Sequence, residues 1–282
     1  MSGKLKNTVK SFVLILAFLG VVGIAGTATY VYSTYQRAGT HTEDRLVYIP
    51  KGSHFGDIVR VLKQEGVLAE DRVFHIVNRV TGRHTALKAG EYEVPASASA
   101  ADISRQLATG ETYDRFFTVV EGQSVRQVIA QLRAEPYLRG EITRLPPEGE
   151  LLPETYHYQR GDDRQDLVDQ MQRDMKETLA RLWEDRAPGL PLDTPYEALV
   201  LASIVEKETA IADERDHVAA VFVNRLNKGM RLQADPTVVY ALTKGEGALG
   251  RKLLRRDLEI DSPYNTYRIR LPILRRNQFR RP

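Results

Sequence analysis

Hydrophobic residues are concentrated first in one uninterrupted stretch near the N-terminus. Residues 11–36 contain no charged side chain and consist mainly of Val, Leu, Ile, Ala, Gly and Phe. About twenty such residues span the hydrocarbon core of a bilayer as a helix. The pattern predicts a single transmembrane anchor at residues 11–33, preceded by a short tail at residues 1–10 and followed by a polar linker at residues 34–45.

The charges beside this stretch predict its orientation. Because lysines lie in the tail and none lies in the apolar run, the positive-inside rule keeps the N-terminus cytoplasmic and the rest of the chain outside. Tyr30, Tyr32 and Tyr35 lie where an interfacial belt of aromatic residues is expected. The alternative is a cleaved signal peptide, for which the small residues 26–28 offer a site. We favour the uncleaved anchor because the apolar run continues past that point.

A strand, a glycine turn and an amphipathic helix then occur twice in the same order. The first copy has a strand at residues 46–50, Ser53 as the expected helix cap, and apolar residues at helical spacing over 55–62. The second copy repeats this pattern over residues 117–132, with Ser124 as the cap. The recurrence indicates an internal duplication.

Another strand and another helix lie between the two copies. Residues 87–95 are predicted to form the strand, and residues 99–107 the helix, which begins with a capping serine. We therefore divide this region into an α+β module at residues 46–110 and a second strand–turn–helix unit at residues 111–145.

The rest of the chain is predicted to be mainly helical. An amphipathic helix over residues 162–183 is followed by a central helix that is apolar on all sides over 198–205, and then by a helix over 213–227. A helix that is apolar all round is expected to be buried on nearly every side. Residues 146–158 form the junction, so we expect a mainly helical α+β domain over 146–282 and an α+β fold for the whole chain.

Composition and charge exclude several classes of function. The net charge is +3, and much of the positive excess lies in the last dozen residues, so the pattern gives no case for nucleic-acid binding. There are no cysteines, which excludes disulfides and thiolate metal sites. The 6 histidines are scattered without ligand spacing, so we expect no metal site.

Two carboxylates, Glu206 and Glu208, end the apolar run of the central helix. A glutamate in a low-dielectric environment keeps its proton to higher pH, and this is the state that a general acid needs near neutrality. The alternative is a helix that reaches the surface after Val205 and carries both acids as solvated charges. Helical spacing does not choose between the two acids, because both lie over apolar or small residues.

Four motifs follow one another in the C-terminal half. They are Ala-Ser-Ile-Val-Glu-Lys-Glu-Thr at residues 202–209, Val-Phe-Val-Asn-Arg-Leu at 221–226, Arg-Leu-Gln-Ala-Asp-Pro-Thr at 231–237 and Tyr-Asn-Thr-Tyr at 264–267. In this order they resemble the endolytic murein transglycosylase family, also called YceG-like. The resemblance extends from the N-terminal apolar segment to about Tyr267, and it implies that Glu206 is the catalytic acid and base.

The resemblance implies a lyase anchored in the bacterial inner membrane, with its catalytic domain on the periplasmic, extracytoplasmic side. Such an enzyme cleaves the β-1,4 bond between N-acetylmuramic acid and N-acetylglucosamine in nascent peptidoglycan and leaves 1,6-anhydro ends. Glycan strands are then the expected substrate and peptidoglycan synthases the expected protein partners. We expect contact with the lipid bilayer through residues 11–33 and no cofactor.

Residues of the third motif are candidates for substrate binding. Gln233 and Asp235 precede a helix that is predicted over residues 237–242. Asp235 is equally suited to cap that helix, because aspartate is common directly before a proline at a helix start. Gln233 has no comparable local role, so a sugar contact is the favoured interpretation.

Further candidates lie on either side of the central helix. Tyr264, Asn265 and Tyr267 form an aromatic and amide cluster of the kind that stacks on sugar rings and hydrogen-bonds to them, although such loops also cover cores. Glu154 lies in residues 151–156, which resemble the start of the family's catalytic region. It is a second candidate acid, and a turn or cap residue is the alternative.

The module at residues 46–110 resembles LysM, a small α+β fold that binds N-acetylated sugars along glycan strands. The strand–glycine–serine–helix pattern that carries this resemblance is common in other folds. Glycan binding and a scaffold without sugar affinity are therefore equally compatible with the sequence.

The sequence departs from the family after Tyr267. Residues 268–282 are rich in arginine and lack the Gly-Leu-Pro-Pro segment and the further elements with which the family continues. We expect a catalytic domain that is incomplete at its C-terminus, through a frameshift or a truncation, and weak or absent activity. The second hypothesis is therefore a catalytically impaired glycan-binding or scaffold protein. A third, the older label of aminodeoxychorismate lyase, denotes a cytosolic pyridoxal-phosphate enzyme, against which the predicted export argues.

Overall fold

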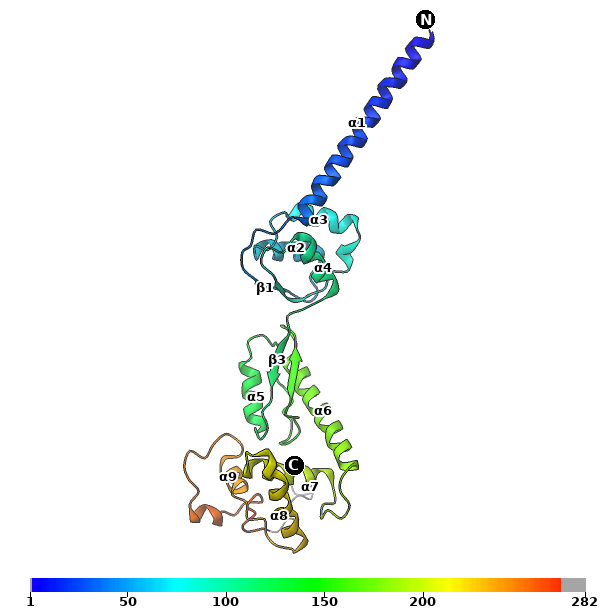
Figure 1. The fold of residues 1–282 in the computed structure, drawn as a ribbon. Coiled ribbons are helices and arrows are strands. Elements are labelled where there is room, and N and C mark those ends of the chain that lie inside the picture. Colours follow the sequence, from blue (N-terminus) through cyan, green and yellow to red (C-terminus); the bar gives the residue numbers. More distant parts are fainter. Residues whose placement is uncertain (1, 270–282) are drawn as a thin grey trace. The chain divides into compact units, whose positions relative to one another are not determined.

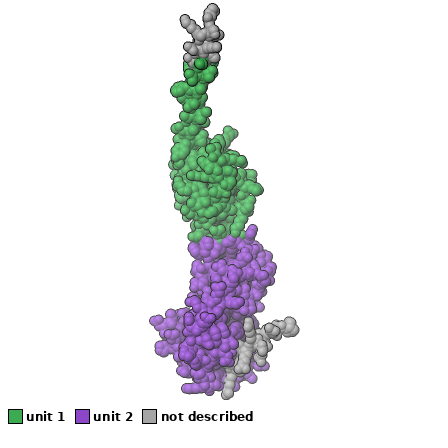
Figure 2. Space-filling view, turned by 90° about the vertical axis from the view of Figure 1, so that its right-hand side faces the viewer, with its two compact units in different colours: residues 1–115, 159–161 green, residues 116–158, 162–282 purple. Residues whose placement is uncertain are grey.

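The structure is a computed structural model, and it describes residues 2–269 of the chain. The chain forms two compact units (Figure 2), one of residues 1–115 with 159–161 and the other of residues 116–158 with 162–282. Residues 116–145 of the predicted second strand–turn–helix unit lie in the same compact unit as most of the predicted catalytic domain. The predicted departure of the C-terminus from the family falls largely on residues 270–282, which lie outside the described residues.

The first unit begins with one long helix, α1 (Ser2–Gln36) (Figure 1). Its residues Phe12–Gln36 are long and apolar enough to cross a membrane. Tyr30 and Tyr32 are exposed, as an interfacial belt requires, but Tyr35 is only 2% exposed. Its ring lies 6.5 Å from that of Phe74 in the core of the unit. The prediction that Tyr35 belongs to the belt is therefore wrong, because the last turn of α1 packs against the folded module.

The predicted linker is irregular but packed. His41 is buried, and its Nε2 lies 2.7 Å from the carbonyl oxygen of Pro95. The amide of Gly39 donates to the carbonyl of Ser97 at 2.9 Å, and the amide of Ser97 donates to the carbonyl of His41 at 2.9 Å. The segment is therefore fastened to the first unit and does not act as a free tether.

The core of the first unit lies under a two-stranded antiparallel sheet in which Val47 pairs with Tyr92. The elements after α1 are β1 (Arg45–Ile49), α2 (Phe55–Gln64), α3 (Asp71–Val80), a 3-10 turn (Arg83–Thr85), β2 (Gly90–Val94) and α4 (Ala100–Thr109). The predicted strands and helices of this region are confirmed, and α3 is an addition. Helix α2 begins after His54 and not after Ser53, whose hydroxyl donates to the carbonyl of Pro50 at 2.7 Å.

The buried Tyr35 gives a first prediction. Tyr35→Ala is expected to destabilise the first unit by about 3 kcal/mol, the usual cost of deleting a large buried ring. Tyr35→Phe should be neutral or slightly stabilising, because among the described residues the buried hydroxyl has no hydrogen-bond partner. Urea unfolding read by limited proteolysis of the first unit measures both effects. Tyr32→Ala, on the exposed part of α1, is the matched control, and an equal loss there would contradict the packing role.

The second unit combines a two-stranded sheet of β3 and β4 with a group of helices. Its elements are β3 (Arg115–Thr118), α5 (Val125–Ala134), β4 (Thr155–Tyr158), α6 (Arg164–Glu184), α7 (Pro195–Glu208), α8 (Arg215–Asn227) and α9 (Asp235–Thr243), with 3-10 turns at Ala212–Glu214 and Arg255–Glu259. Helix α7 contacts α6, α8 and α9. Ala202 and Ser203 are nevertheless exposed, so the prediction of burial on nearly every side is wrong for α7.

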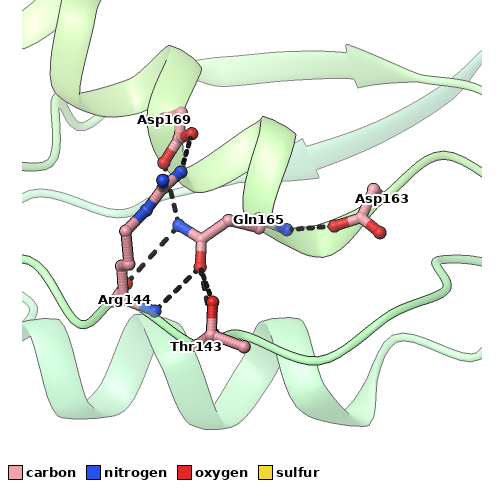
Figure 3. Close-up of polar contacts among 5 residues, drawn as sticks. All are labelled: Thr143, Arg144, Asp163, Gln165 and Asp169. Atoms are coloured by element: carbon pink, nitrogen blue, oxygen red, sulfur yellow. Dashed lines mark hydrogen bonds and ion pairs between the residues drawn. The ribbon is translucent and has the colours of Figure 1, made fainter.

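Polar side chains hold the start of α6 in place (Figure 3). Asp163 caps the helix, with Oδ1 accepting from the amide of Gln165 at 2.8 Å. The Gln165 side chain accepts from the amides of Thr143 and Arg144, both at 3.0 Å, and donates to Asp169 at 2.8 Å. This network fixes the loop after α5 against α6 and so supports the helical part of the unit.

Candidate functional site

Helix α7 carries the candidate acid at its C-terminal end. Thr194 caps the helix by accepting from the amide of Glu197 at 3.2 Å, and Pro195 occupies the first turn, as the sequence predicts. Leu201, Ile204 and Val205 are buried. The buried face therefore fixes the rotation of the helix, and Glu206 lies in its last turn.

Glu206 lies on the wall of an open depression of about 350 Å³. The other walls are mainly apolar, and their residues are Leu190, Leu192, Ala198, Leu201, Ala202, Val205, Ala219 and Val223, with Arg215 and Asp216 as the charged members. The side chain of Glu206 is 27% exposed, so it is neither a fully solvated charge nor a buried one. Arg215 donates from Nη2 to Oε1 of Glu206 at 3.0 Å.

The turn of the second repeat lies beside the same acid. Gly122 has a φ of +73°, and a Cβ at this position would lie 3.6 Å from Cγ of Glu206 and 3.0 Å from Nζ of Lys207. Ser124 caps α5 and its hydroxyl also donates to the carbonyl of Gly245. A turn that resembles the first repeat in sequence is therefore packed against the end of α7, where glycine permits the close approach.

A second polar group, Asp235 with Tyr267, lies close enough to Glu208 for its charge to act on that acid. The hydroxyl of Tyr267 donates to Oδ1 of Asp235 at 2.6 Å, and this hydrogen bond, with burial, raises the pKa of Tyr267 to about 12. Partial burial raises the pKa of Glu208, and the nearby carboxylate of Asp235 adds to the effect, although Arg225 opposes it. Asp235 is the first residue of α9 and Ala234 its cap, so the alternative role of Asp235 as cap is wrong.

Gln233 lies where the third and fourth motifs meet. Its amide donates to the carbonyl of Thr266 at 3.2 Å, and its φ of +54° is unusual for a residue with a side chain. The hydroxyl of Thr266 accepts from the amide of Ala234 at 3.0 Å. Gln233 and Asp235 are both exposed. The structure thus brings Gln233, Asp235 and Tyr267 to one edge of the unit.

Asn265 and Tyr264 have other surroundings. Asn265 is fully buried, and its Nδ2 donates to the carbonyls of Leu258 and Ile260 at 3.0 and 2.8 Å. These bonds hold the loop that carries Tyr267. The ring of Tyr264 meets that of Tyr240 edge to face at 4.9 Å, and Nζ of Lys244 lies 4.9 Å from the Tyr264 ring centre.

Glu154 is exposed directly before β4, and its carbonyl accepts from the amide of Val119 at 2.9 Å. Its side chain is not among those that line the depression beside Glu206.

Sequence reasoning missed Glu148, whose Oε2 accepts from the amide of Val125 at 2.9 Å and whose pKa is raised by burial. It also missed Arg215, because a basic residue at a helix start gives no distinctive pattern.

Residues 47–272 match the YceG-like family. The chain is 27% identical to the endolytic murein transglycosylases of two Streptococcus pneumoniae strains, over alignments that cover 93% of this chain and 55% of each relative. It is 29% identical to the endolytic murein transglycosylase of Bacillus subtilis, with 79% of this chain and 69% of the relative covered. A crystal structure of a YceG-like protein of Listeria monocytogenes shares 29% identity over 81% of this chain and 84% of that chain, with a TM-score of 0.46. The chain spans about half the length of the Streptococcus relatives.

Proposed function

Because this chain belongs to the YceG-like family, we propose that it is a membrane-anchored lytic transglycosylase that cleaves within peptidoglycan glycan strands. The observation that carries the proposal is the position of Glu206, a half-buried acid on the wall of an open, mainly apolar depression. Sugar rings present apolar C–H faces and N-acetyl methyl groups, and such a depression suits them. The acid lies where a bridging oxygen of a bound strand can be reached.

In this mechanism one carboxyl group serves twice. Glu206 donates its proton to the oxygen between N-acetylmuramic acid and N-acetylglucosamine as the C1–O bond breaks. The muramoyl C6 hydroxyl then attacks C1, and the Glu206 carboxylate takes the proton of that hydroxyl. The products are an N-acetylglucosamine end and a 1,6-anhydro ring, with no water consumed. The nucleophile belongs to the substrate, so its proximity replaces a second protein carboxylate.

We assign substrate contacts to the exposed edge formed by Gln233, Asp235 and Tyr267, with Tyr264 as a further aromatic surface. Asn265 supports this edge by holding its loop and has no exposed group with which to reach a sugar. Glu154 is given no role in proton transfer, because it is exposed before β4 and does not line the depression.

The N-terminal elements give the proposed enzyme its place in the cell. Helix α1 anchors the chain in the inner membrane with its N-terminus in the cytoplasm and both compact units on the periplasmic side. The order of strand, two helices and strand in residues 45–94 supports a LysM-like module that binds glycan strands. Peptidoglycan synthases are the proposed partners, because they make the strands that this enzyme would cut.

The test is to incubate the detergent-solubilised full chain with uncrosslinked glycan strands and to identify the new ends by mass spectrometry. We expect 1,6-anhydro ends. Reducing ends without the anhydro ring would show hydrolysis and contradict the proposed mechanism. Strands that bind to the chain but remain uncut would support instead the catalytically impaired scaffold.

A further inference from the structure

One cation contacts the acid of the proposed mechanism. Arg215, the first residue of α8, places Nη2 3.0 Å from Oε1 of Glu206. Among the residues that the structure describes, this is the one hydrogen bond to the Glu206 carboxyl group. Lys207 is the next cation along α7, but its Nζ lies beside Gly122 on the turn of the second repeat. Arg215 is therefore the basic side chain that the fold directs to Glu206.

The turn between α7 and α8 fixes the distance between the two residues. The hydroxyl of Thr209 donates to Oε2 of Glu214 at 2.8 Å, and the amide of Ile211 donates to the Thr209 hydroxyl at 3.1 Å. These bonds join the last turn of α7 to the residue before Arg215. The Nε atom of Arg215 is also buried, so the base of its guanidinium is packed although 40% of the side chain is exposed.

We propose that Arg215 is a positioning residue for Glu206: it fixes Oε1, so that Oε2 is the oxygen that gives and takes the proton. This inference rests on the proposed transglycosylase function. A protonated carboxyl group can accept a hydrogen bond at one oxygen while it donates from the other. Once the proton has left, the negative charge lies against a guanidinium that was already in place, and such charge-assisted bonds are stronger than neutral ones.

Kinetics of Arg215 variants of the full chain test this role. Arg215→Ala is expected to lower kcat by about 10²-fold, the cost of a catalytic group displaced by about 1 Å, and to leave KM within about twofold. Arg215→Lys should recover part of kcat, because its ammonium group reaches Oε1 but lacks the planar fork of arginine. Arg181→Ala, an exposed position on α6, is the matched control and should match the parent.

A double variant separates positioning from a general structural effect. Arg215→Ala made in a Glu206→Gln background should cost nothing further, because Arg215 acts through the carboxyl group that is already gone. If the parent is active and the kcat losses of the two single variants multiply in the double variant, the positioning role of Arg215 is overturned while the proposed function stands. A rise in KM with kcat unchanged would also overturn it. A folded parent that leaves glycan strands uncut would overturn the proposed function and this role with it.

Discussion

Glu206→Gln is expected to reduce the rate of 1,6-anhydro end formation by about 10²- to 10⁴-fold, the usual contribution of a general acid and base. The substitution keeps the size and polarity of the side chain but removes the ionisable carboxyl group that gives and takes the proton. The carboxyl group is 27% exposed and its hydrogen bond from Arg215 can be kept by the amide oxygen, so the fold should not change. Mass spectrometry of digested glycan strands measures the rate.

The second acid of the same motif is the informative comparison. Partial burial and the charge of Asp235 raise the pKa of Glu208, and a raised pKa suits a general acid. Glu206 is the candidate by position, because it lines the depression and contacts the guanidinium of Arg215. We expect Glu208→Gln to lower the rate less than tenfold. If Glu208→Gln removes the activity and Glu206→Gln does not, the catalytic role belongs to Glu208. Glu177→Gln, at an exposed position on α6, is the neutral control.

Glu91→Gln is expected to destabilise the first unit by about 3 kcal/mol. The Glu91 side chain is 2% exposed and accepts hydrogen bonds from Arg115 at 2.6 Å and from Arg160 at 3.0 Å. Removing the charge weakens the ion pair of Glu91 with Arg115, whose side chain is only 13% exposed. The estimate is at the low end for a broken buried ion pair, because Arg160 is 40% exposed and water can solvate it.

The same triad makes the stability of the first unit depend on pH. Burial alone would raise the pKa of Glu91, but the hydrogen bonds and charges of Arg115 and Arg160 outweigh it and hold the pKa below the usual 4.5. The unfolded chain therefore takes up the proton first as the pH falls. The stabilisation is fully present above about pH 4.5 and is lost as the pH falls through the lower, folded-state pKa.

Hydrogen exchange of the β1 and β2 amides measures this effect, with peptides of the second unit as an internal reference. A loss of 3 kcal/mol corresponds to exchange about 10²-fold faster through global opening of the unit. Glu93→Gln makes the same chemical change at an exposed position of the same strand and should alter exchange little. Equal acceleration in the two variants would contradict a buried, paired Glu91.

Local pattern was sufficient to place most elements of this chain. The long apolar N-terminal helix, the two copies of strand and helix, and the capped starts of α4, α5 and α7 each depend on residues within a few positions of one another. Helix α3 was not among the predicted elements, although its apolar residues, such as Val73, Phe74 and Val77, have helical spacing. Glu206 could likewise be recognised as a candidate acid from the sequence, because an acid directly after an apolar helical run is a local feature.

Tertiary packing decided what those local features contact. Tyr35 continues an apolar run that suits a membrane, yet it lies in a protein core because α3 and α4 cover the end of α1. The Asn265 side chain is an amide of the kind that binds sugars, but its Nδ2 donates to two backbone carbonyls of its own loop. The path of that loop, and not the residue type, places these carbonyls beside the amide.

The apolar N-terminal helix, the order of the elements, the family and the motif that contains the candidate acid could all be predicted from the sequence, since each is encoded in neighbouring residues. The contact of Glu206 with Arg215, the effect of the Asp235 charge on Glu208, and the approach of the Gly122 turn to the end of α7 depend on tertiary packing. Helical periodicity gives the direction of a side chain relative to its own helix. It does not give the identity of the neighbour, which depends on how separate helices and turns pack together.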